Sequence, residues 1–296
     1  MELLRVENLC KYYPNKKALD GVSFTVNSGE IVALIGRNGA GKTTLMNSIS
    51  SIIYPTSGAV YYKNSNLLND NSYLQEFGIL INATFFEYLS IYDNLRLLMI
   101  ASGATDKHLM RQTIIETLRL VGLEGQIRKK VKSFSFGMKQ RLGLAQTLLM
   151  PINFMILDEP FVGLDPSGKE LLKNVIRSKA RKENCGILFS SHDLNDVTEI
   201  CDRIVMIDDG KKVYDDVFHE EKQYVIEVDV TDNPDILTKL FQDLDGTVKV
   251  TEGKFALKNK ALLNEVQNRL SASGIPVLDM QVRENSLYDL FKEEES

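Results

Sequence analysis

The sequence GRNGAGKTT, residues 36–44, decides the fold class of this chain. It follows the short apolar run Ile31–Ile35 and opens a segment with helical composition. A glycine-rich turn of the pattern G-x-x-x-x-G-K-[ST], set between a strand and a helix, is typical of a phosphate-binding loop. The backbone N–H groups of such a loop surround the β- and γ-phosphates, and the helix N-terminus adds a favourable dipole. The stretch therefore predicts an α/β, P-loop NTPase core.

The residue types of this loop match the chemistry of a nucleoside triphosphate. Lys42 would neutralise phosphate charge, and the Thr43 hydroxyl would ligate Mg²⁺. The predicted nucleotide-binding residues of the loop are Gly36, Arg37, Asn38, Gly39, Ala40, Gly41, Lys42, Thr43 and Thr44.

An acidic pair follows a second apolar run. Asp158 and Glu159 come directly after residues 154–157, which have the composition of a buried strand. One carboxylate at such a strand end can hold Mg²⁺, and its neighbour can orient and deprotonate the attacking water. Two acids can also simply start a surface loop. Beside a phosphate loop, the catalytic interpretation is the stronger one.

The stretch FSFGMKQR, residues 134–141, resembles the signature of the nucleotide-binding domains of ABC transporters. The resemblance covers roughly residues 1–220, and it implies an ABC-type core that binds ATP and Mg²⁺ and hydrolyses ATP. It also implies that the signature contacts the γ-phosphate held by an opposite subunit, through Ser135, Phe136, Gly137 and Met138. Taken alone, Ser135 would be a helix N-cap, and the two roles are compatible.

The other motifs of that family follow in the same order. Asp165, in Gly-Leu-Asp, resembles the D-loop aspartate, and His192, in Ser-Ser-His, resembles the switch histidine. The resemblance implies that Glu159 and His192 are the catalytic pair. Tyr13 aligns best with the aromatic residue that stacks on adenine, with Tyr12 as the fallback; either tyrosine could instead pack on the sheet edge.

Two positions depart from the common pattern. Phe136 and Met138 stand where glycine and glutamine are usual, and the form S-x-G-M-K-Q-R resembles the bacitracin-resistance and lantibiotic-immunity branch. Asn82 stands where most members have the Q-loop glutamine. It is shorter by one methylene and would reach Mg²⁺ only through water. The predicted metal site therefore consists of Thr43, Asp158 and Asn82.

Residues from about 85 to 150 predict a helical subdomain inserted in the core. Apolar residues recur at helical spacing at Met110, Ile114, Leu118 and Val121, and Gly122 is a plausible stop. A second helix is predicted from Arg141 to Leu149, before Pro151. The aromatic cluster Phe85, Phe86 and Tyr88 either receives a helix of a membrane subunit or packs within this subdomain.

A second domain is predicted over residues 221–296, after an ATPase domain over 1–220. The hairpin 203–214, with its Asp-Gly turn, closes the first. The second shows strand 224–230, helix 234–244, hairpin 247–257 around Gly253, helix 260–272, strand 276–283 and a last helix 286–295. This order predicts a small α+β, ferredoxin-like domain. Its 15 acidic and 9 basic residues give it a net charge of −6. Since the whole chain has a net charge of −5, the acidity lies in this second domain and the remainder is near +1.

Composition limits the classes of partner. A net charge of −5 argues against a general nucleic-acid binder. No stretch reaches the roughly 18 apolar residues of a membrane span, and the start is not a signal peptide. If the protein acts at a membrane, a separate integral membrane subunit must supply the span, with this chain peripheral on the cytoplasmic face.

The resemblance favours one function over two alternatives. It implies the ATPase subunit of an ABC transporter, a homodimer or a heterodimer with a paralogue, that exports an antimicrobial or toxic peptide or another amphipathic compound. A soluble ABC-type ATPase of translation or chromosomes fits poorly, because the chain has one ATPase domain and no long coiled coil. An importer ATPase with a regulatory C-terminal domain is the other alternative, against which the signature and Asn82 argue modestly.

Overall fold

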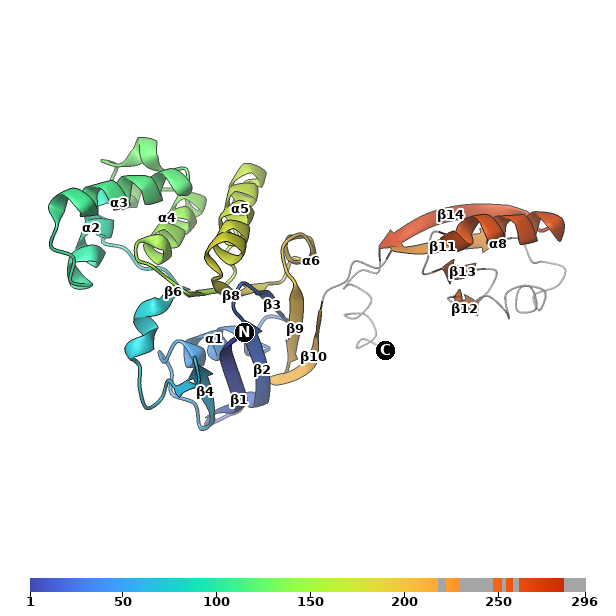
Figure 1. Ribbon diagram of the computed structural model, residues 1–296, viewed down its shortest axis with the longest axis horizontal. Helices are drawn as coiled ribbons and strands as arrows, with labels where there is room; N and C mark the ends of the chain where they lie inside the picture. Colours follow the sequence, from blue (N-terminus) through green and yellow to red (C-terminus); the bar gives the residue numbers. More distant parts are fainter. Residues whose placement is uncertain (218–221, 229–246, 252–253, 258–260, 285–296) are drawn as a thin grey trace. The chain divides into compact units, whose positions relative to one another are not determined.

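The structure is a computed structural model that describes residues 1–217, 222–228, 247–251, 254–257 and 261–284. The chain divides into two compact units, Met1–Phe218 and His219–Ser296 (Figure 1). Among the described residues, no helix is both long and apolar enough to cross a membrane.

The first unit contains an antiparallel sheet of order β2-β1-β4-β5. Its strands are β1 (Glu2–Tyr13), β2 (Lys16–Asn27), β4 (Ser57–Tyr62) and β5 (Ser65–Asn66). Only two residues join β1 to β2, so Tyr13 pairs directly with Lys16. This tight turn places both side chains at one end of the sheet.

A six-stranded sheet of order β10-β9-β3-β8-β7-β6 forms the centre of the same unit. Its strands are β3 (Ile31–Ile35), β6 (Phe77–Leu80), β7 (Phe154–Leu157), β8 (Gly186–Ser191), β9 (Arg203–Asp208) and β10 (Lys211–Val217). All neighbours are parallel except β9 and β10, which form the predicted hairpin with Asp209 and Gly210 at positive φ. Every residue of β3, β7 and β8 is buried, as expected of parallel strands covered on both faces.

The register of this sheet brings the ends of four strands together. Leu80 pairs with Leu157, Leu157 with Phe189, and Ile35 with Ser191. Because these strands are parallel, the residues that follow them emerge at one edge of the sheet. The loop 36–44, the acidic pair and His192 therefore meet there, although they are far apart in sequence.

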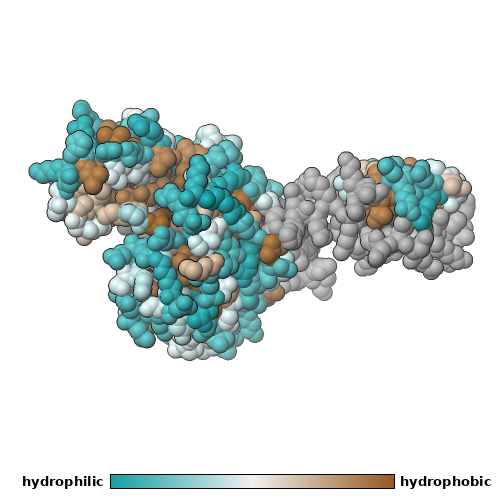
Figure 2. Space-filling view, viewed as in Figure 1, coloured by the Kyte–Doolittle hydropathy of each residue, from teal (hydrophilic) through white to brown (hydrophobic). Residues whose placement is uncertain are grey.

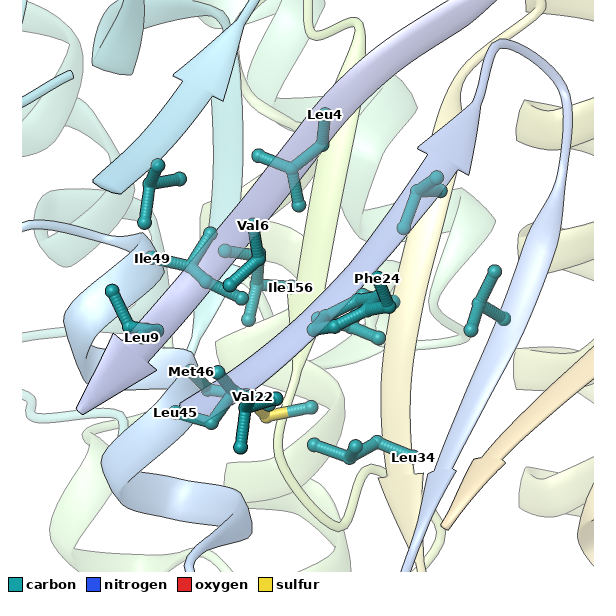
Figure 3. Packing of buried hydrophobic residues seen from close by; sticks show 14 of the residues in the cluster. Leu4, Val6, Leu9, Val22, Phe24, Leu34, Leu45, Met46, Ile49 and Ile156 are labelled. Atoms are coloured by element: carbon teal, nitrogen blue, oxygen red, sulfur yellow. The ribbon is translucent and has the colours of Figure 1, made fainter. Parts of the chain in front are cut away.

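A hydrophobic core joins the two sheets around helix α1 (Lys42–Ile49). Figure 3 shows side chains of β1 and β2 meeting those of α1, with Leu34 and Ile156 from the central sheet beside them. The labelled residues on β1, β2 and α1 are Leu4, Val6, Leu9, Val22, Phe24, Leu45, Met46 and Ile49. This packing fixes the direction in which α1, and with it the phosphate loop, leaves the sheet.

The helical insertion is confirmed between β6 and β7, with α2 (Ile91–Ala101), α3 (Lys107–Leu120) and α4 (Phe136–Leu148) gathered on one side (green, Figure 1). The four residues at helical spacing in α3 and just after it, from Met110 to Val121, are buried. Short 3-10 turns lie before β6 and around this insertion: η1 (Ser72–Glu76), η2 (Glu124–Gln126) and η3 (Val131–Ser133). Two further helices, α5 (Pro166–Glu183) and α6 (Leu194–Thr198), follow β7 and β8.

The predicted start of the second helix, at Arg141, is wrong. Helix α4 starts at Phe136, because the Ser135 hydroxyl accepts a hydrogen bond from the Met138 N–H at 3.3 Å and caps the first turn. The helix ends at Leu148 rather than Leu149, before Pro151.

The second unit is a small α+β domain with a sheet of order β12-β13-β11-β14. Its described elements are β11 (Lys222–Val228), β12 (Thr247–Thr251), β13 (Lys254–Leu257), α8 (Ala261–Ala272) and β14 (Val277–Glu284). All strand pairs are antiparallel, and a core that includes Ile226, Leu257 and Val266 lies between strands and helix. The predicted helices 234–244 and 286–295, and Gly253, lie outside the described residues.

Candidate functional site

The phosphate loop lies between the end of β3 and the start of α1. Gly41 is the N-cap of α1 with φ of 114°, and a Cβ at that position would lie 2.5 Å from the Ala18 carbonyl oxygen. Only glycine can adopt this conformation so close to β2. The first N–H groups of α1 have no partner within the helix and are available to an anion.

Lys42 is buried at the floor of the loop. Its ammonium donates to the carbonyl of Gly36 at 2.7 Å and to that of Arg37 at 3.3 Å. The nearest carboxylate oxygen is that of Glu159 at 4.0 Å. A buried cation held mainly by neutral carbonyls is well placed to attract phosphate oxygens.

Asp158 is fixed by hydroxyl groups on both of its oxygens. Thr43 donates to Oδ2 at 2.7 Å, and Ser190 donates to Oδ1 at 2.6 Å. Hydroxyl and carboxylate oxygens are the donors that Mg²⁺ prefers, and it completes its shell with water and nucleotide phosphates. The residues present therefore fit a magnesium ion that binds with its nucleotide.

Glu159 and His192 form a hydrogen-bonded pair beside this site. The Nδ1 atom of His192 lies 2.8 Å from Oε2 of Glu159. The side chain of His192 is 60% exposed, against 27% for Glu159. The histidine can therefore turn toward a bound ligand, while the carboxylate stays at the strand edge.

A cleft of about 280 Å³ opens above the phosphate loop. Its walls are Tyr13, Lys16, Ala18, Asn38, Gly39, Gly41, Lys42, Thr43, Thr44, Asp158 and Glu159. Tyr13 lies in the cleft, whereas the Tyr12 hydroxyl donates to Asp20 at 3.0 Å. The other three predicted loop residues, Gly36, Arg37 and Ala40, are not among the lining residues.

The signature residues lie away from this cleft. A second cavity, of about 690 Å³, is lined by Asn82, Phe136 and Gln140 together with the acidic pair, which separates it from the first. Phe136 is 62% exposed, and its ring covers Gly163, where a Cβ would lie 2.2 Å from it. None of the four signature residues, Ser135, Phe136, Gly137 and Met138, lines the 280 Å³ cleft. One chain therefore does not bring its own signature to its own phosphate loop.

Asp165 starts helix α5. Asp165 is the N-cap and accepts from the Gly168 N–H at 3.3 Å, and Arg141 of α4 lies 3.7 Å from the same carboxylate. The Ser167 hydroxyl and the Arg141 guanidinium hold the pKa of Asp165 below its usual value. Asp165 thus connects the signature helix to the helix that follows the acidic pair.

A network of charges joins α5 to α6, the short helix that follows His192. Lys173 is only 5% exposed and lies 3.0 Å from Asp196 and 2.8 Å from Glu199. Lys169 adds a contact of 2.6 Å to the same Asp196. Burial opposes the charge on Lys173, yet its pKa is raised by Glu199 and Asp196. These contacts fix α6, which begins two residues after the histidine.

Sequence reasoning missed three residues of this region. Lys16 lines the cleft and donates to the Gly39 carbonyl at 2.8 Å. The sequence feature that could have indicated it is the two-residue turn, which pairs Lys16 with Tyr13. Gln140 donates to the carbonyls of Glu159 and Pro160, both at 3.3 Å. Ser190 bonds Asp158, and its signal was a polar residue at the end of an apolar strand.

Comparison with known proteins gives consistent relatives. The sequence pattern of the ABC transporter family matches residues 19–162. The bacitracin transport ATP-binding protein BcrA of Bacillus licheniformis is 31% identical over 98% of this chain and 96% of its own length. The lantibiotic transport ATP-binding protein SrtF of Streptococcus pyogenes is 35% identical over 75% of this chain and 91% of its own. A solved structure of an ATP-binding subunit of an ABC transporter is 31% identical, covers 73% of this chain and 90% of its own, and has a TM-score of 0.67.

Proposed function

The chain belongs to the ABC transporter family of ATP-binding proteins, and on this premise we propose that its ATP hydrolysis drives export of an antimicrobial or toxic peptide, or another amphipathic compound. The observation that carries the proposal is the relation to the bacitracin transport protein, which runs over 98% of the chain and so includes the second unit. The importer and the soluble ATPase have no such support among the relatives described above.

The site residues have separate roles in the proposed mechanism. Adenine stacks on Tyr13, and the loop 36–44 holds the phosphates. Lys42 neutralises part of their negative charge. Glu159 accepts a proton from the attacking water, and the 2.8 Å contact with His192 keeps its carboxylate in place until the histidine turns to the γ-phosphate. Tyr13, Lys42 and Glu159 line one cleft, and His192 lines an adjoining pocket that shares Glu159, which is the support for this assignment.

Mg²⁺ would be held by Thr43 and Asp158, with Asn82 acting through water. When bound, the ion neutralises charge that develops on the β- and γ-phosphate oxygens. Asn82 lines the larger cavity and Thr43 lines the cleft, and Asp158 and Glu159 line both, so the acidic pair lies between the two side chains.

The signature would act on a second copy of the chain, or on a paralogue. Ser135 starts α4, and its first-turn N–H groups suit a γ-phosphate. Because the signature does not line the chain's own cleft, a partner must bring it there. Each ATP then lies between the phosphate loop of one subunit and Ser135 of the other.

A separate membrane-spanning subunit would dock on the helical side of the first unit. Phe86 and Tyr88 are 65% and 78% exposed, whereas Phe85 lines the larger cavity. Figure 2 shows hydrophobic surface over the helical part of this unit. An exposed aromatic pair beside a cavity suits a helix from a partner, and it would hold the chain on the cytoplasmic face of the membrane. We assign residues 1–220 to the ATPase domain and 221–296 to a small additional domain.

Purification of the tagged chain from membranes in mild detergent tests the partner. We expect a polytopic membrane protein in equal amount. Recovery of ribosomes or soluble proteins alone, in several detergents, would favour the soluble ATPase instead.

Growth in the presence of bacitracin, and separately of a lantibiotic, tests the cargo. In a host that carries the chain and its membrane partner, the wild-type chain should raise the inhibitory concentration of at least one of these peptides, and Glu159→Gln should not. Equal sensitivity to both peptides with and without the wild-type chain would exclude these two peptides as cargo.

A further inference from the structure

Strand β8 ends in two serines although its whole length is buried. All six residues from Gly186 to Ser191 are buried, and Ser190 has 0% exposure. A parallel strand covered on both faces normally carries apolar side chains. A hydroxyl in such a place is unfavourable unless its hydrogen bonds are made within the protein.

The Ser190 hydroxyl makes two hydrogen bonds, one to each residue of the acidic pair. It donates to Oδ1 of Asp158 at 2.6 Å and accepts from the backbone N–H of Glu159 at 2.7 Å. A serine hydroxyl has one proton to donate, and Asp158 receives it. The register explains the placement, because Leu157 pairs with Phe189 and the next residues on each strand are neighbours.

Glu159 needs this support because its backbone is turned. It has φ of 47°, in the left-handed region that is unfavourable for a residue with a Cβ. Such a conformation persists where the surroundings determine it from several sides. Ser190 holds the N–H of Glu159, and Gln140 holds its carbonyl at 3.3 Å.

We propose that Ser190 is a positioning residue for ATP hydrolysis. Its hydroxyl fixes the carboxylate of Asp158 and the turned backbone of Glu159 relative to each other. The inference rests on the roles proposed above for these two acids. Ser190 does not line the 280 Å³ cleft, and its two hydrogen bonds go to the acidic pair, so its loss should affect turnover more than ATP binding.

Steady-state ATP hydrolysis by the full chain with Ser190→Ala tests this proposal. Misplacement of a reacting group by about 1 Å can cost on the order of 100-fold in rate, so we expect kcat to fall roughly 10- to 100-fold. The KM for MgATP should stay within about twofold, because Ser190 does not line the cleft and the misplaced Glu159 acts on the attacking water rather than on bound ATP. Ser190→Thr keeps the hydroxyl and should keep kcat within about threefold of wild type.

Ser50→Ala is the matched control. Ser50 is also a buried serine, 4% exposed, but its hydroxyl donates only to the Met46 carbonyl, at 2.8 Å, at the far end of α1. This variant loses a buried hydroxyl without touching the acidic pair, so its kcat should match wild type. Thermal melting of all variants identifies losses of folded protein.

Several outcomes would overturn the proposal. These are an unchanged kcat in Ser190→Ala, a rise in KM without loss of kcat, and a folded Ser190→Thr protein as slow as Ser190→Ala. The variant Glu159→Gln distinguishes failure of the inference about Ser190 from failure of the proposed ATP site. If Glu159→Gln hydrolyses ATP as fast as wild type, the assignment of Glu159 is wrong; if it is inactive while Ser190→Ala is fully active, only the inference about Ser190 fails.

Discussion

Two lysines of the first unit lie at the phosphate loop, and they differ in exposure. Lys42 is buried at the floor of the loop, whereas Lys16 approaches from β2 and bonds the Gly39 carbonyl at the rim. An exposed cation at the rim attracts phosphate through solvent, so its contribution to ATP binding is modest and depends on salt. It is not placed to act on the bond that breaks.

Replacing Lys16 should therefore weaken binding and leave chemistry intact. For Lys16→Gln we expect KM for MgATP to rise about three- to tenfold at low salt, with kcat little changed, because uniform binding is lost. The measurement is steady-state ATPase activity at two salt concentrations, and the effect should shrink at the higher one.

Lys17→Gln is the control for that experiment. Lys17 is the next residue, but its ammonium lies over the Tyr12 ring at 5.3 Å and 3.7 Å from Asp20. An equal rise of KM in both variants would mean that general charge, rather than the position of Lys16, is responsible.

Single residues also show what could be predicted from the sequence. The phosphate loop and the acidic pair carry their chemistry in contiguous motifs, so their positions followed from the sequence and the sheet register. Lys16, Gln140 and Ser190 act through contacts with residues distant in sequence, at separations of 23, 19 and 32 positions. Only the folded sheet reveals such contacts.

At the scale of elements, Glu76 joins the two sheets of the first unit. Its Oε2 accepts from Tyr62 of β4 at 2.9 Å, from Lys63 at 2.5 Å and from Asn153, just before β7, at 2.7 Å. Burial alone would raise the pKa of Glu76, but the bonds from Asn153, Lys63 and Tyr62 outweigh it and lower the pKa. The carboxylate therefore stabilises the fold in its charged form.

Glu76→Gln should destabilise the protein in a pH-dependent way. At neutral pH we expect a loss of about 1–2 kcal/mol in the free energy of unfolding, since a charged acceptor of three bonds is replaced. A lowered folded pKa means that this stabilisation is complete above the unfolded value of about 4.3 and disappears as pH falls through the folded pKa. Chemical denaturation of both proteins from pH 7 downward measures the difference.

Glu124→Gln supplies the comparison for Glu76. Glu124 pairs with Arg119 at 2.8 Å, but the two side chains are 55% and 65% exposed. Such a surface pair contributes about 0–1 kcal/mol. Two results would contradict an electrostatic role of Glu76. Both variants could lose the same free energy of unfolding, or the difference between Glu76→Gln and wild type could persist at the lowest pH.

Strong local patterns predict their elements well, whereas at the start of α4 the apolar pattern and the cap residue give different answers. The apolar runs of β3, β7 and β8 and the periodicity of α3 identified these elements. The apolar pattern predicts a start at Arg141, five residues late, because the glycine and methionine after Phe136 have no helical periodicity, whereas Ser135 as an N-cap gives the observed start. Side-chain capping outweighed the weak pattern.

At the scale of the whole molecule, the residues proposed for the ATP site lie at two places on one chain. The cleft holds Lys42 and the acidic pair, and the signature at Ser135 belongs to the helical insertion. If ATP is hydrolysed only between two chains, the Lys42 of one chain and the Ser135 of the other belong to the same site. Mutations at these two positions should then complement each other.

A mixture of Lys42→Ala and Ser135→Arg chains tests this arrangement. Each variant alone forms dimers in which both sites carry a lesion, so each should be inactive. In a mixed dimer both lesions fall in one site, and the other site has a wild-type Lys42 and a wild-type Ser135. With random assortment, about half of the dimers are mixed and have one intact site, so the mixture should recover about a quarter of the wild-type rate. ATP hydrolysis is measured before and after mixing, and melting curves check that Ser135→Arg, which loses its N-cap, remains folded. A mixture that stays inactive although both variants are folded would mean that the two residues act within one chain, or that the natural partner is a different chain.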